Sequence, residues 1–469
     1  MDMHRHSHLL LLLLPLLASQ PASATPVWQL IRRDVGTVQL PANLPVAEMS
    51  GVTYLGPVDG QLRTHRFLTA NENYGALLAF DLIVNSDGTI GNLNKLITGA
   101  TTLPLGSTND FEGIAYTSAA RNSVFLSDET GPNVREYSLA TGSLLQSVSI
   151  PSVFGASMRS NRGFESLARS PNGATLWTAN EEALAVDGPV ATTSAAATVR
   201  LLNLNANGTN YSVGSQYAYQ VDPIQSPGNA SSQSGLVDLT AMPDGTVLAL
   251  ERSFSSAAFP TIFRSRIYEL NFSSATDFGG AFASGLVGQT YTPVGKSLLW
   301  SGVVGAFGEN LEGLTLGPRL DNGDWVLVGV VDKDSADPLS MNSVVTFVMR
   351  AAPAADFSQN GAVDAADYTV WRDNTGLMVG ATNSLGDADR DGDVDEADYA
   401  VWQNAFAAAA TATASVPEPT AMMLLALFAT GFSARPVLLR KSQPPYGLAR
   451  SRRPNYGAIT PNCFSSSRV

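Results

Sequence analysis

The chain has 469 residues, a formal net charge of −13 and one cysteine, Cys463, close to its carboxyl end. This length is enough for a large core with appended modules. The excess negative charge repels nucleic acid and attracts cations, so we expect no nucleic-acid partner. A single cysteine excludes a disulfide scaffold, and stability must come from packing or from bound metal.

The first 24 residues are predicted to form a secretory signal peptide. Arg5 precedes the apolar run 9–18, and Ala22-Ser-Ala24 supplies the small residues of a cleavage site. The apolar run is too short to span a bilayer as an anchor. We therefore expect a secreted or envelope-associated, extracytoplasmic protein.

Residues 25–350 contain a unit of two short strands that recurs five times. First strands are expected at 50–54, 111–116, 164–168, 237–242 and 311–316. Second strands, which end in acidic residues, are expected at 67–72, 124–129, 176–182, 247–251 and 325–332. Such repeats predict an all-β propeller of five to six blades, with room for a sixth blade in 190–225 or 255–300. The run 27–40 is expected to supply an outer strand that closes the last blade.

Acidic residues recur within this unit, and equivalent residues of successive blades face one another around a central channel. The first-strand acids are Glu112, Glu165, Asp238 and Glu312. The second-strand acids are Glu72, Asp128, Glu129, Glu181, Glu182, Glu251 and Asp332. Like charges held close together require a bound cation or protonation. The pattern therefore fits a calcium or carboxylate site, and it fits equally well a set of acids that support turns and backbone amides.

Most other hydrolytic chemistries are excluded by residue content. His65 is the only histidine outside the signal segment, and the motifs Gly-x-Ser-x-Gly and Gly-x-x-x-x-Gly-Lys do not occur. Histidine-dependent triads, cysteine nucleophiles and zinc clusters are therefore not expected. Hydrolysis would depend on carboxylates and a hard cation such as Ca²⁺. In this hypothesis calcium is held by Glu112, Glu165 and Glu312, and Arg162 or Arg252 pairs with the anion of the substrate.

Several ordered segments carry a family resemblance. They are NDFEGIAY at 109–116, NRGFESLARSPNGATLWTANEEAL at 161–184, GLVDLTAMPDGTVLALERSF at 235–254 and ENLEGLTLGP at 309–318. The region resembles the bacterial phytase-like domain, a family named for an esterase-like activity of phytase. The resemblance implies a secreted propeller that hydrolyses a phosphorylated or ester small molecule. The alternative is a non-enzymatic, calcium-stabilised propeller that acts as an envelope binding or scaffold protein.

Beyond a predicted linker at 351–355, residues 356–406 contain two calcium-loop motifs that start 31 positions apart. Oxygen ligands at positions 1, 3, 5, 9 and 12, with glycine at position 6, are typical of EF-hand loops. The expected ligands are Asp356, Ser358, Asn360, Asp364 and Asp367 in the first loop and Asp387, Asp389, Asp391, Asp395 and Asp398 in the second. Ser358 and Asn360 make the first loop the weaker predicted site.

A Tyr-x-Val-Trp sequence follows each loop and predicts a pair of helices, which makes this a small α-helical paired calcium-loop module. The pair of loops resembles a dockerin type I module. This resemblance implies calcium binding and a cohesin-like protein partner. An acidic, disordered linker is the alternative, and the duplicated register of loop and helix argues against it.

Residues 407–415 are predicted to form a second linker, and Val416-Pro-Glu-Pro-Thr420, the apolar run 421–432 and Arg435 follow it. The segment 416–441 resembles a PEP-CTERM sorting signal, and it is the only part expected to contact a membrane. Pro436 ends the apolar run before a spanning length is reached. The tail 442–469 is basic; a short irregular anchor or an altered reading frame would each account for it. From Arg435 onward there are seven basic residues and no acid, so the rest of the chain carries a formal charge of −20.

Overall fold

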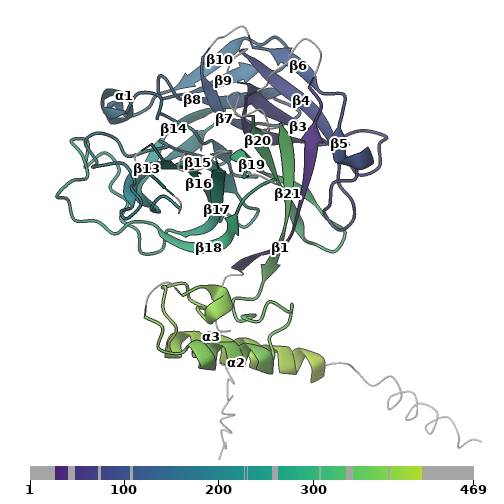
Figure 1. Cartoon of the computed structure of the whole chain (residues 1–469), viewed down its shortest axis with the longest axis vertical. Coiled ribbons are helices and arrows are strands. Elements are labelled where there is room, and N and C mark those ends of the chain that lie inside the picture. Colours follow the sequence, from purple (N-terminus) through teal and green to yellow (C-terminus); the bar gives the residue numbers. More distant parts are fainter. Residues whose placement is uncertain are drawn as a thin grey trace, which may run out of the picture. The chain divides into compact units, whose positions relative to one another are not determined.

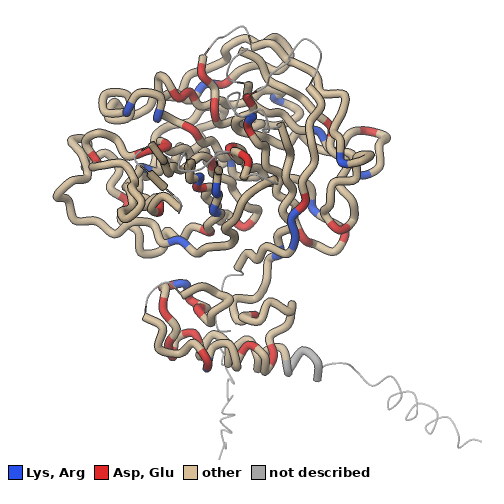
Figure 2. The backbone as a smooth tube through the Cα atoms, viewed as in Figure 1, with Lys and Arg blue, Asp and Glu red and all other residues tan. Residues whose placement is uncertain are grey.

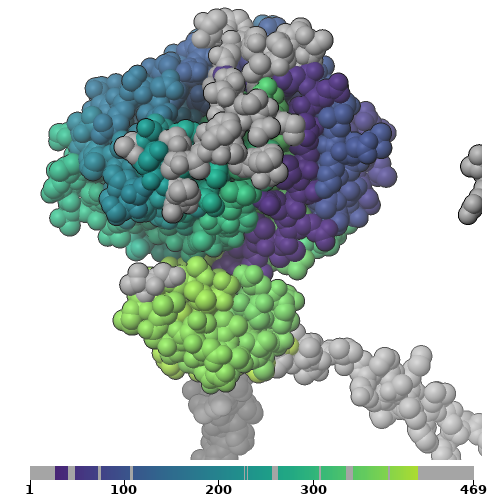
Figure 3. Space-filling view, viewed as in Figure 1, coloured from purple at the N-terminus to yellow at the C-terminus, as the bar shows by residue number. Residues whose placement is uncertain are grey.

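The computed structural model describes residues 27–40, 48–71, 75–105, 109–225, 228–229, 231–255, 262–305, 308–333, 342–378 and 381–414. Within these ranges the strands form five sheets around a common axis (Figure 1). These sheets form an all-β propeller of five blades, the lower of the two numbers that the repeats predicted. The colours run in chain order around the axis in Figure 3.

Blades 1 to 4 are antiparallel sheets, and the strands of each follow the order of the chain from the axis outward. Blade 1 consists of β2 (Met49–Pro57), β3 (Thr64–Asn71), β4 (Ala76–Ile83) and β6 (Thr101–Pro104). Blade 2 consists of β7 (Phe111–Tyr116), β8 (Ser123–Asp128), β9 (Asn133–Ser138) and β10 (Leu144–Val148). Blade 3 consists of β11 (Ala168–Arg169), β12 (Thr175–Ala179), β13 (Ala197–Asn207) and β14 (Asn210–Val221). Blade 4 consists of β15 (Gln233–Ala241), β16 (Val247–Ser255), β17 (Ile262–Asn271) and β18 (Gly295–Gly302).

Blade 5 is closed by the amino-terminal strand. It consists of β19 (Asn310–Arg319), β20 (Trp325–Asp332), β21 (Ser343–Ala352) and β1 (Val27–Val38), with the short β5 (Leu96–Ile97) at its edge. In this blade β1 pairs antiparallel with β21, from Val27 opposite Ala352 to Thr37 opposite Ser343 (Figure 1). The closing strand expected at 27–40 is confirmed.

No sixth sheet occurs among the residues that the structure describes. The intervals that left room for one belong to existing blades, because 190–225 supplies β13 and β14 and 255–300 supplies β17 and β18. Strands β13 and β14 form a long outer hairpin, and residues 272–294 connect β17 with β18, so the extra sequence between repeats enlarges blades 3 and 4.

Apolar side chains fill the spaces between the faces of neighbouring blades. Phe67 of blade 1 packs in one cluster with Val328 of blade 5. The next residue, Leu68, packs in another cluster with Val124 of blade 2. Successive side chains of a strand point to opposite faces, so one strand contributes to two cores. Full burial of such a side chain contributes about 1.5–3 kcal/mol, and the closed ring of blades leaves each face covered.

The carboxyl-terminal part is helical. The helices α2 (Ala365–Asn374) and α3 (Glu396–Ala414) follow the two acidic loops, and a short helix η2 (Asn383–Leu385) lies between them. Two smaller helices, η1 (Leu93–Lys95) and α1 (Ser152–Ser157), connect strands of the propeller. Figure 2 shows the acidic residues on the loops and helices of 356–414.

Both predicted linkers differ from the structure. Strand β21 continues to Ala352, and Ala354 and Ala355 are buried, so 351–355 is packed chain. Helix α3 continues to Ala414, so most of the expected linker 407–415 is helical. Alanine has the highest helix propensity, and the alanine-rich composition that suggested flexibility extends the helix instead.

Three predicted segments lie outside the described residues: the predicted signal peptide 1–24, the predicted sorting segment 416–441 and the basic tail 442–469. In the part of the chain that is described, no helix has the length and apolar character needed to span a membrane.

Candidate functional site

A β-bulge at one level of each inner strand directs a pair of residues to the propeller axis. The pairing between first and second strand skips residues at Glu112, at Val237 and at Glu312. In blade 3, Phe164 pairs with Asn180 and Ala168 pairs with Trp177. Between these two pairs the first strand therefore has one residue more than the second strand. A bulge leaves its extra residue outside the ladder and redirects the side chain. This common irregularity brings Glu112, Glu165 and Glu312 to equivalent positions.

The expected equivalence of Asp238 with these glutamates is wrong by one residue. Val237 occupies the bulge, and Asp238 stands at the level of Gly113 and Gly313. Leu239 N donates to Asp238 Oδ1 over 2.8 Å, and Leu314 N donates to Oδ2 over 2.6 Å. Asp238 therefore joins β15 to β19. Asp238 thus supports backbone amides, which is the role that the sequence analysis gave as the alternative to cation binding for all the recurring acids.

The small residues at this level allow direct contact between inner strands. A methyl group on Gly51 would overlap the backbone oxygen of Glu112, and one on Gly113 would overlap the backbone nitrogen of Leu167. Glycine is required where two backbones approach this closely. The inner strands consequently pack in register around the axis, and the bulge residues of neighbouring blades lie next to one another.

The second strands contribute their own ring of residues. Asp128 pairs with Phe111 in blade 2, and Glu251 pairs with Leu236 in blade 4. The residues that come directly after Asp128 and Glu251 therefore occupy equivalent positions. These positions hold Glu129, Glu181, Arg252 and Asp332, and Glu72 lies outside the described residues. Blade 4 therefore breaks both acidic rings, with Val237 in the first and Arg252 in the second.

Two of the expected second-strand acids lie one residue before the axial positions in the sequence, and they contact side chains within their own region of the propeller. Asp128 accepts from Arg135 NH1 over 2.6 Å. Glu251 accepts from Tyr219 Oη and from Lys296 Nζ, each over 2.6 Å. Their charges are thus balanced within outer parts of the blades. A register shift of one residue separates these structural acids from the axial ones.

Two groups of carboxylates meet at Glu129. Oxygens of Asp110, Glu112 and Glu129 lie within 4.8 Å of one another, and so do oxygens of Glu129, Glu165 and Glu181. Glu129 and Glu181 are 2% and 1% exposed. Glu129 Oε1 accepts no hydrogen bond from any residue that the structure describes, and its nearest cation, Arg162 NH1, is 3.9 Å away. A buried oxygen with unused acceptor capacity between two carboxylate groups fits a hard cation.

Burial and mutual repulsion shift the protonation of this group. Burial raises the pKa of Glu129 to about 7, and Glu181 and Asp110 add to the rise against a hydrogen bond from Glu165 and the charge of Arg162. Burial also raises the pKa of Glu165 well above its usual value, with Glu112 and Glu181 adding to it. Burial raises the pKa of Asp332 to about 8, and Glu312 adds to it. At neutral pH the site must therefore hold protons or a cation.

Glu312 lies apart from the two groups, and the three glutamates proposed from the sequence do not form a single cluster. Glu312 pairs with Arg252, whose NH1 also donates to Asn310 Oδ1 over 2.9 Å. Arg252 NH2 donates to Glu181 Oε1 over 2.7 Å. Arg252 thus connects blades 3, 4 and 5. Arg162 NH1 lies 3.0 Å from Glu181 Oε2, so both arginines border the acids.

Asp110 was missed by the sequence analysis. It immediately precedes the repeat, and burial together with Asp128 raises its pKa. The only signal for it is the pair of acids that flanks Phe111.

The paired loops after the propeller hold their first and last aspartates in the interior. Asp356, Asp367, Asp387 and Asp398 are each at most 1% exposed. Backbone amides point at these carboxylates: Gly361 N donates to Asp356 over 2.9 Å, and the equivalent Gly392 N to Asp387 over 3.1 Å. Such a nest of amides preorganises acidic side chains around a small volume.

The two loops differ in their acidic ligands. Oxygens of Asp387, Asp389 and Asp398 lie within 4.8 Å of one another, as do those of Asp393, Asp395 and Asp398. Both groups belong to the second loop, in which Asp391 is exposed. Burial raises the pKa of Asp387 to about 7, and Asp398 adds to it. The remaining first-loop residues are Ser358 and Asn360, which are not acidic, and Asp364, which caps α2 by accepting from Ala366 N over 2.7 Å.

Two tryptophans tie the loops together. Trp371 of α2 donates from Nε1 to the backbone oxygen of Asp395 over 2.7 Å. Trp402 of α3 donates from Nε1 to the backbone oxygen of Asp364 over 3.1 Å. Each tryptophan follows one loop and binds position 9 of the other. The duplicated sequence therefore forms a reciprocal contact.

The fold and the axial acids define a five-bladed β-propeller with a candidate cation site at one end of its axis. Residues 45–335, more than half of the chain, match the phytase-like family model described as "Esterase-like activity of phytase", and the chain belongs to this family. All the axial acids lie within the matched region. No curated protein is similar enough to the chain to match it.

Solved structures resemble the chain only distantly. An endo-arabinase from Bacteroides thetaiotaomicron has 10% identity and a TM-score of 0.34 over 66% of this chain and 96% of its own. A glutaminyl cyclase from Myxococcus xanthus has 11% identity and a TM-score of 0.30 over 70% of this chain and 97% of its own. Hydrazine synthase of Kuenenia stuttgartiensis has 10% identity and a TM-score of 0.26, with 66% of each chain covered.

Proposed function

We propose that the propeller is a calcium-dependent hydrolase of a phosphoester or ester, with its site at the axial acids. The observation that carries the proposal is the pair of carboxylate groups that share Glu129, with one buried oxygen left without a donor. Family membership adds support, because the family is described by an esterase-like activity. The proposed hydrolase is an extracytoplasmic protein, in keeping with the predicted signal peptide.

The donor set suits calcium, which prefers oxygen ligands. Calcium bound at Glu129 and its neighbours would polarise a phosphoryl or carbonyl oxygen and activate a water molecule. Arg252 and Arg162 supply positive charge beside the carboxylates, where an anionic group of the substrate would bind. The substrate itself is proposed only as a class, a phosphorylated or ester small molecule.

A second candidate function is a non-enzymatic, calcium-stabilised scaffold. The observation that favours it is the engagement of both arginines by carboxylates: Arg252 connects Glu181 of blade 3 with Glu312 of blade 5. In this arrangement calcium and arginine would together hold the blades closed, and no substrate would be needed.

The experiment compares hydrolysis of a phosphomonoester, phytate and a carboxylic ester by the full chain, first with calcium and then with chelator. Glu129→Gln keeps the shape of the side chain and removes its charge, and we expect it to lower activity and calcium affinity about 10–100-fold. Glu136→Gln is the control, because Glu136 is buried in β9 and pairs with Arg121. Activity that persists in chelator, or in Glu129→Gln, would contradict the hydrolase. Calcium-dependent melting without hydrolysis of any substrate would favour the scaffold.

For the module 356–406 we propose calcium binding in both loops and docking of a cohesin-like protein partner. The buried aspartates and the amides that point at them support the first part. The partner rests on the resemblance of the loops alone. Recovery of a partner from the native organism, with and without chelator, tests it, and absence of any calcium-dependent partner would contradict it.

A further inference from the structure

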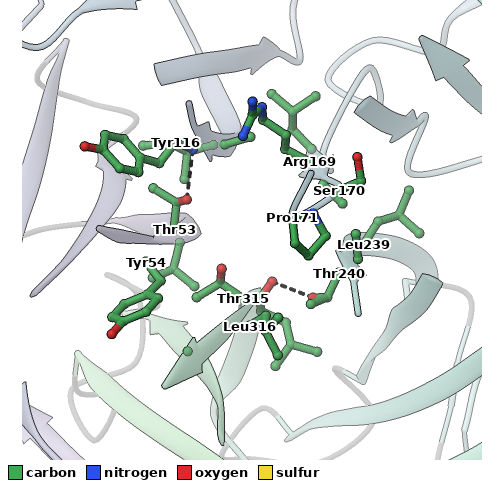
Figure 4. A pocket seen from close by; sticks show the side chains of 18 of the residues that line it. Thr53, Tyr54, Tyr116, Arg169, Ser170, Pro171, Leu239, Thr240, Thr315 and Leu316 are labelled. Carbon is green, nitrogen blue, oxygen red and sulfur yellow. Dashed lines mark hydrogen bonds between the residues drawn. The ribbon is translucent and has the colours of Figure 1, made fainter. Parts of the chain in front are cut away.

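A cavity of about 330 Å³ is lined by the inner strands (Figure 4). Its lining residues come after the level of the axial acids along the inner strands, so the cavity lies toward the other end of the propeller axis. All five inner strands contribute to its wall. In each strand the lining residues come directly after Gly51, Gly113 or the equivalent residue, where neighbouring backbones touch. Nothing in the proposed hydrolase uses this cavity.

The inner strands separate this cavity from the acidic site by two layers. The first layer is the ring of small residues, where Gly51 and Gly113 allow neighbouring backbones to touch. The second layer is aliphatic, and its members are Val52, Ile114, Leu167, Leu239 and Leu314, all buried. This aliphatic layer forms the floor of the cavity. A ligand there would not contact the axial carboxylates.

Hydroxyl groups line the wall above the floor. Thr53 Oγ1 accepts from Tyr116 N over 3.0 Å and keeps its hydrogen for another acceptor. Thr240 Oγ1 donates to the backbone oxygen of Leu314 over 2.7 Å and keeps lone pairs for another donor (Figure 4). A threonine hydroxyl has one hydrogen to donate and two lone pairs to accept. The cavity wall therefore offers both donors and acceptors, and Thr315 adds a third hydroxyl.

Three aromatic residues border the cavity, but their rings pack into the cores between blades. Tyr54, Tyr116 and Trp325 are partly exposed, and each packs against a different hydrophobic cluster. In Figure 4 the rings of Tyr54 and Tyr116 point away from the cavity. The Tyr54 ring contacts Phe67, and its hydroxyl is 2.8 Å from His65 Nδ1. The surface open to a ligand is therefore formed by the hydroxyls and the aliphatic floor.

The wall carries almost no charge available to a ligand. It contains no carboxylate, and Arg169 is its only charged side chain. Arg169 donates from NH1 to the backbone oxygen of Thr117 over 2.8 Å and from Nε to Tyr211 Oη over 3.2 Å. A cation would find no counter-charge, and an anion would meet a guanidinium that is already engaged. The wall therefore favours an uncharged ligand.

We propose that this cavity is a binding site for a neutral sugar ring. Ligand cavities typically have volumes of about 300–1,000 Å³, so this one is large enough for a single sugar ring. The hydroxyls of the sugar can pair with the threonine hydroxyls, and its C–H groups can contact the aliphatic floor. Binding is independent of calcium, because the aliphatic floor separates the ligand from the acids.

The test titrates the full chain with a panel of neutral monosaccharides and with the matching sugar phosphates, by calorimetry and saturation-transfer NMR. Thr315→Phe fills the cavity, and Thr141→Phe places the same ring on an exposed turn as a control. Thr53→Val removes a hydroxyl from the wall and serves if Thr315→Phe does not fold. We expect saturable binding of a neutral sugar that weakens at least about tenfold in either cavity variant. Binding should be unchanged in Thr141→Phe, in Glu129→Gln and in chelator.

Three results would overturn the proposal. The first is the absence of binding of every neutral sugar to the folded chain up to about 50 mM. The second is equal binding by a folded Thr315→Phe variant. The third is binding of sugar phosphates alone, or binding lost in chelator, either of which would assign the sugar to the acidic site. The hydrolase can fail without affecting any of these outcomes, and the reverse also holds.

Discussion

Replacing Glu129 with glutamine should stabilise the calcium-free protein at alkaline pH. The pKa of Glu129 is raised by burial from 4.5 to about 7, so the folded state holds this proton more tightly than the unfolded state. Below about pH 4.5 both states are protonated and Glu129 has no effect. Between about pH 4.5 and 7 the unfolded state loses this proton while the folded state keeps it, so the free energy of unfolding falls by about 3 kcal/mol at 1.36 kcal/mol per pKa unit. Above about pH 7 both states are ionised and the full penalty remains.

Glutamine carries no charge at any pH and removes this penalty. In chelator, Glu129→Gln should therefore melt above the wild type at about pH 8.5 and together with it at about pH 4.5. Calcium should reverse the order at pH 8.5, because a ligand at a hundred times its dissociation constant adds about 2.7 kcal/mol to the wild type and less to the variant.

The assay is thermal or urea unfolding of both proteins across this pH range, with calcium or chelator. Glu136→Gln is a control of opposite sign. Burial raises the pKa of Glu136, but hydrogen bonds from Arg121 and Ser123 lower it on balance, so its ionised form stabilises the fold. That variant should melt earlier at pH 8.5 in every condition. A calcium-free Glu129→Gln variant that melts below the wild type at pH 8.5 would refute the electrostatic reasoning.

Three further predictions concern other residues. Asp238→Asn replaces one of the two carboxylate oxygens that accept from Leu239 N and Leu314 N, so one amide loses its acceptor. We expect a loss of about 1–3 kcal/mol in the free energy of unfolding and unchanged calcium affinity, measured by urea unfolding and calorimetry. Asp387→Ala should weaken calcium binding to the full chain more than Asp356→Ala, since the second loop has more charged ligands; equal losses in calorimetry would contradict this. Trp371→Phe keeps the aromatic ring but removes the bond to the other loop, and it should weaken calcium binding there about 3–10-fold by titration. An unchanged affinity would make that contact purely structural.

The repeat was readable from the sequence because turn residues and β-rich runs recur at a regular spacing. The inner strands of blades 1, 2, 4 and 5 and the closing strand β1 lie where that spacing placed them, whereas the strand expected at 164–168 is reduced to β11 at Ala168–Arg169. The axial positions of Glu112 and Glu165 also followed from the alignment of Phe-Glu-Gly with Phe-Glu-Ser. The sequence left room for a sixth blade because the repeated motif covers only the first two strands of a blade. The lengths of the outer strands and of their connections cannot be read from that motif.

The register of blade 4 was misjudged because a bulge inserts one residue without leaving a mark in composition. Comparison of Leu-Val-Asp-Leu-Thr with Leu-Glu-Gly-Leu-Thr would have matched Val237 with Glu312 and Asp238 with Gly313. The same correction places Arg252 among the second-strand acids. The pairing of Arg252 with Glu312, the contribution of Asp110 and the cavity depend on contacts between blades, which the sequence of a single repeat does not specify.

The central claim is that the calcium-dependent chemistry resides at the axial acids of the propeller. The most direct measurement is the calcium dependence of hydrolysis in a full chain that carries both Asp356→Ala and Asp387→Ala, so that the loops no longer bind calcium. We expect the rate to rise with calcium to the same plateau and half-maximal concentration as in the wild type. Adding Glu129→Gln to this variant should lower the plateau about 10–100-fold. Hydrolysis that no longer responds to calcium, or that survives Glu129→Gln unchanged, would contradict the claim.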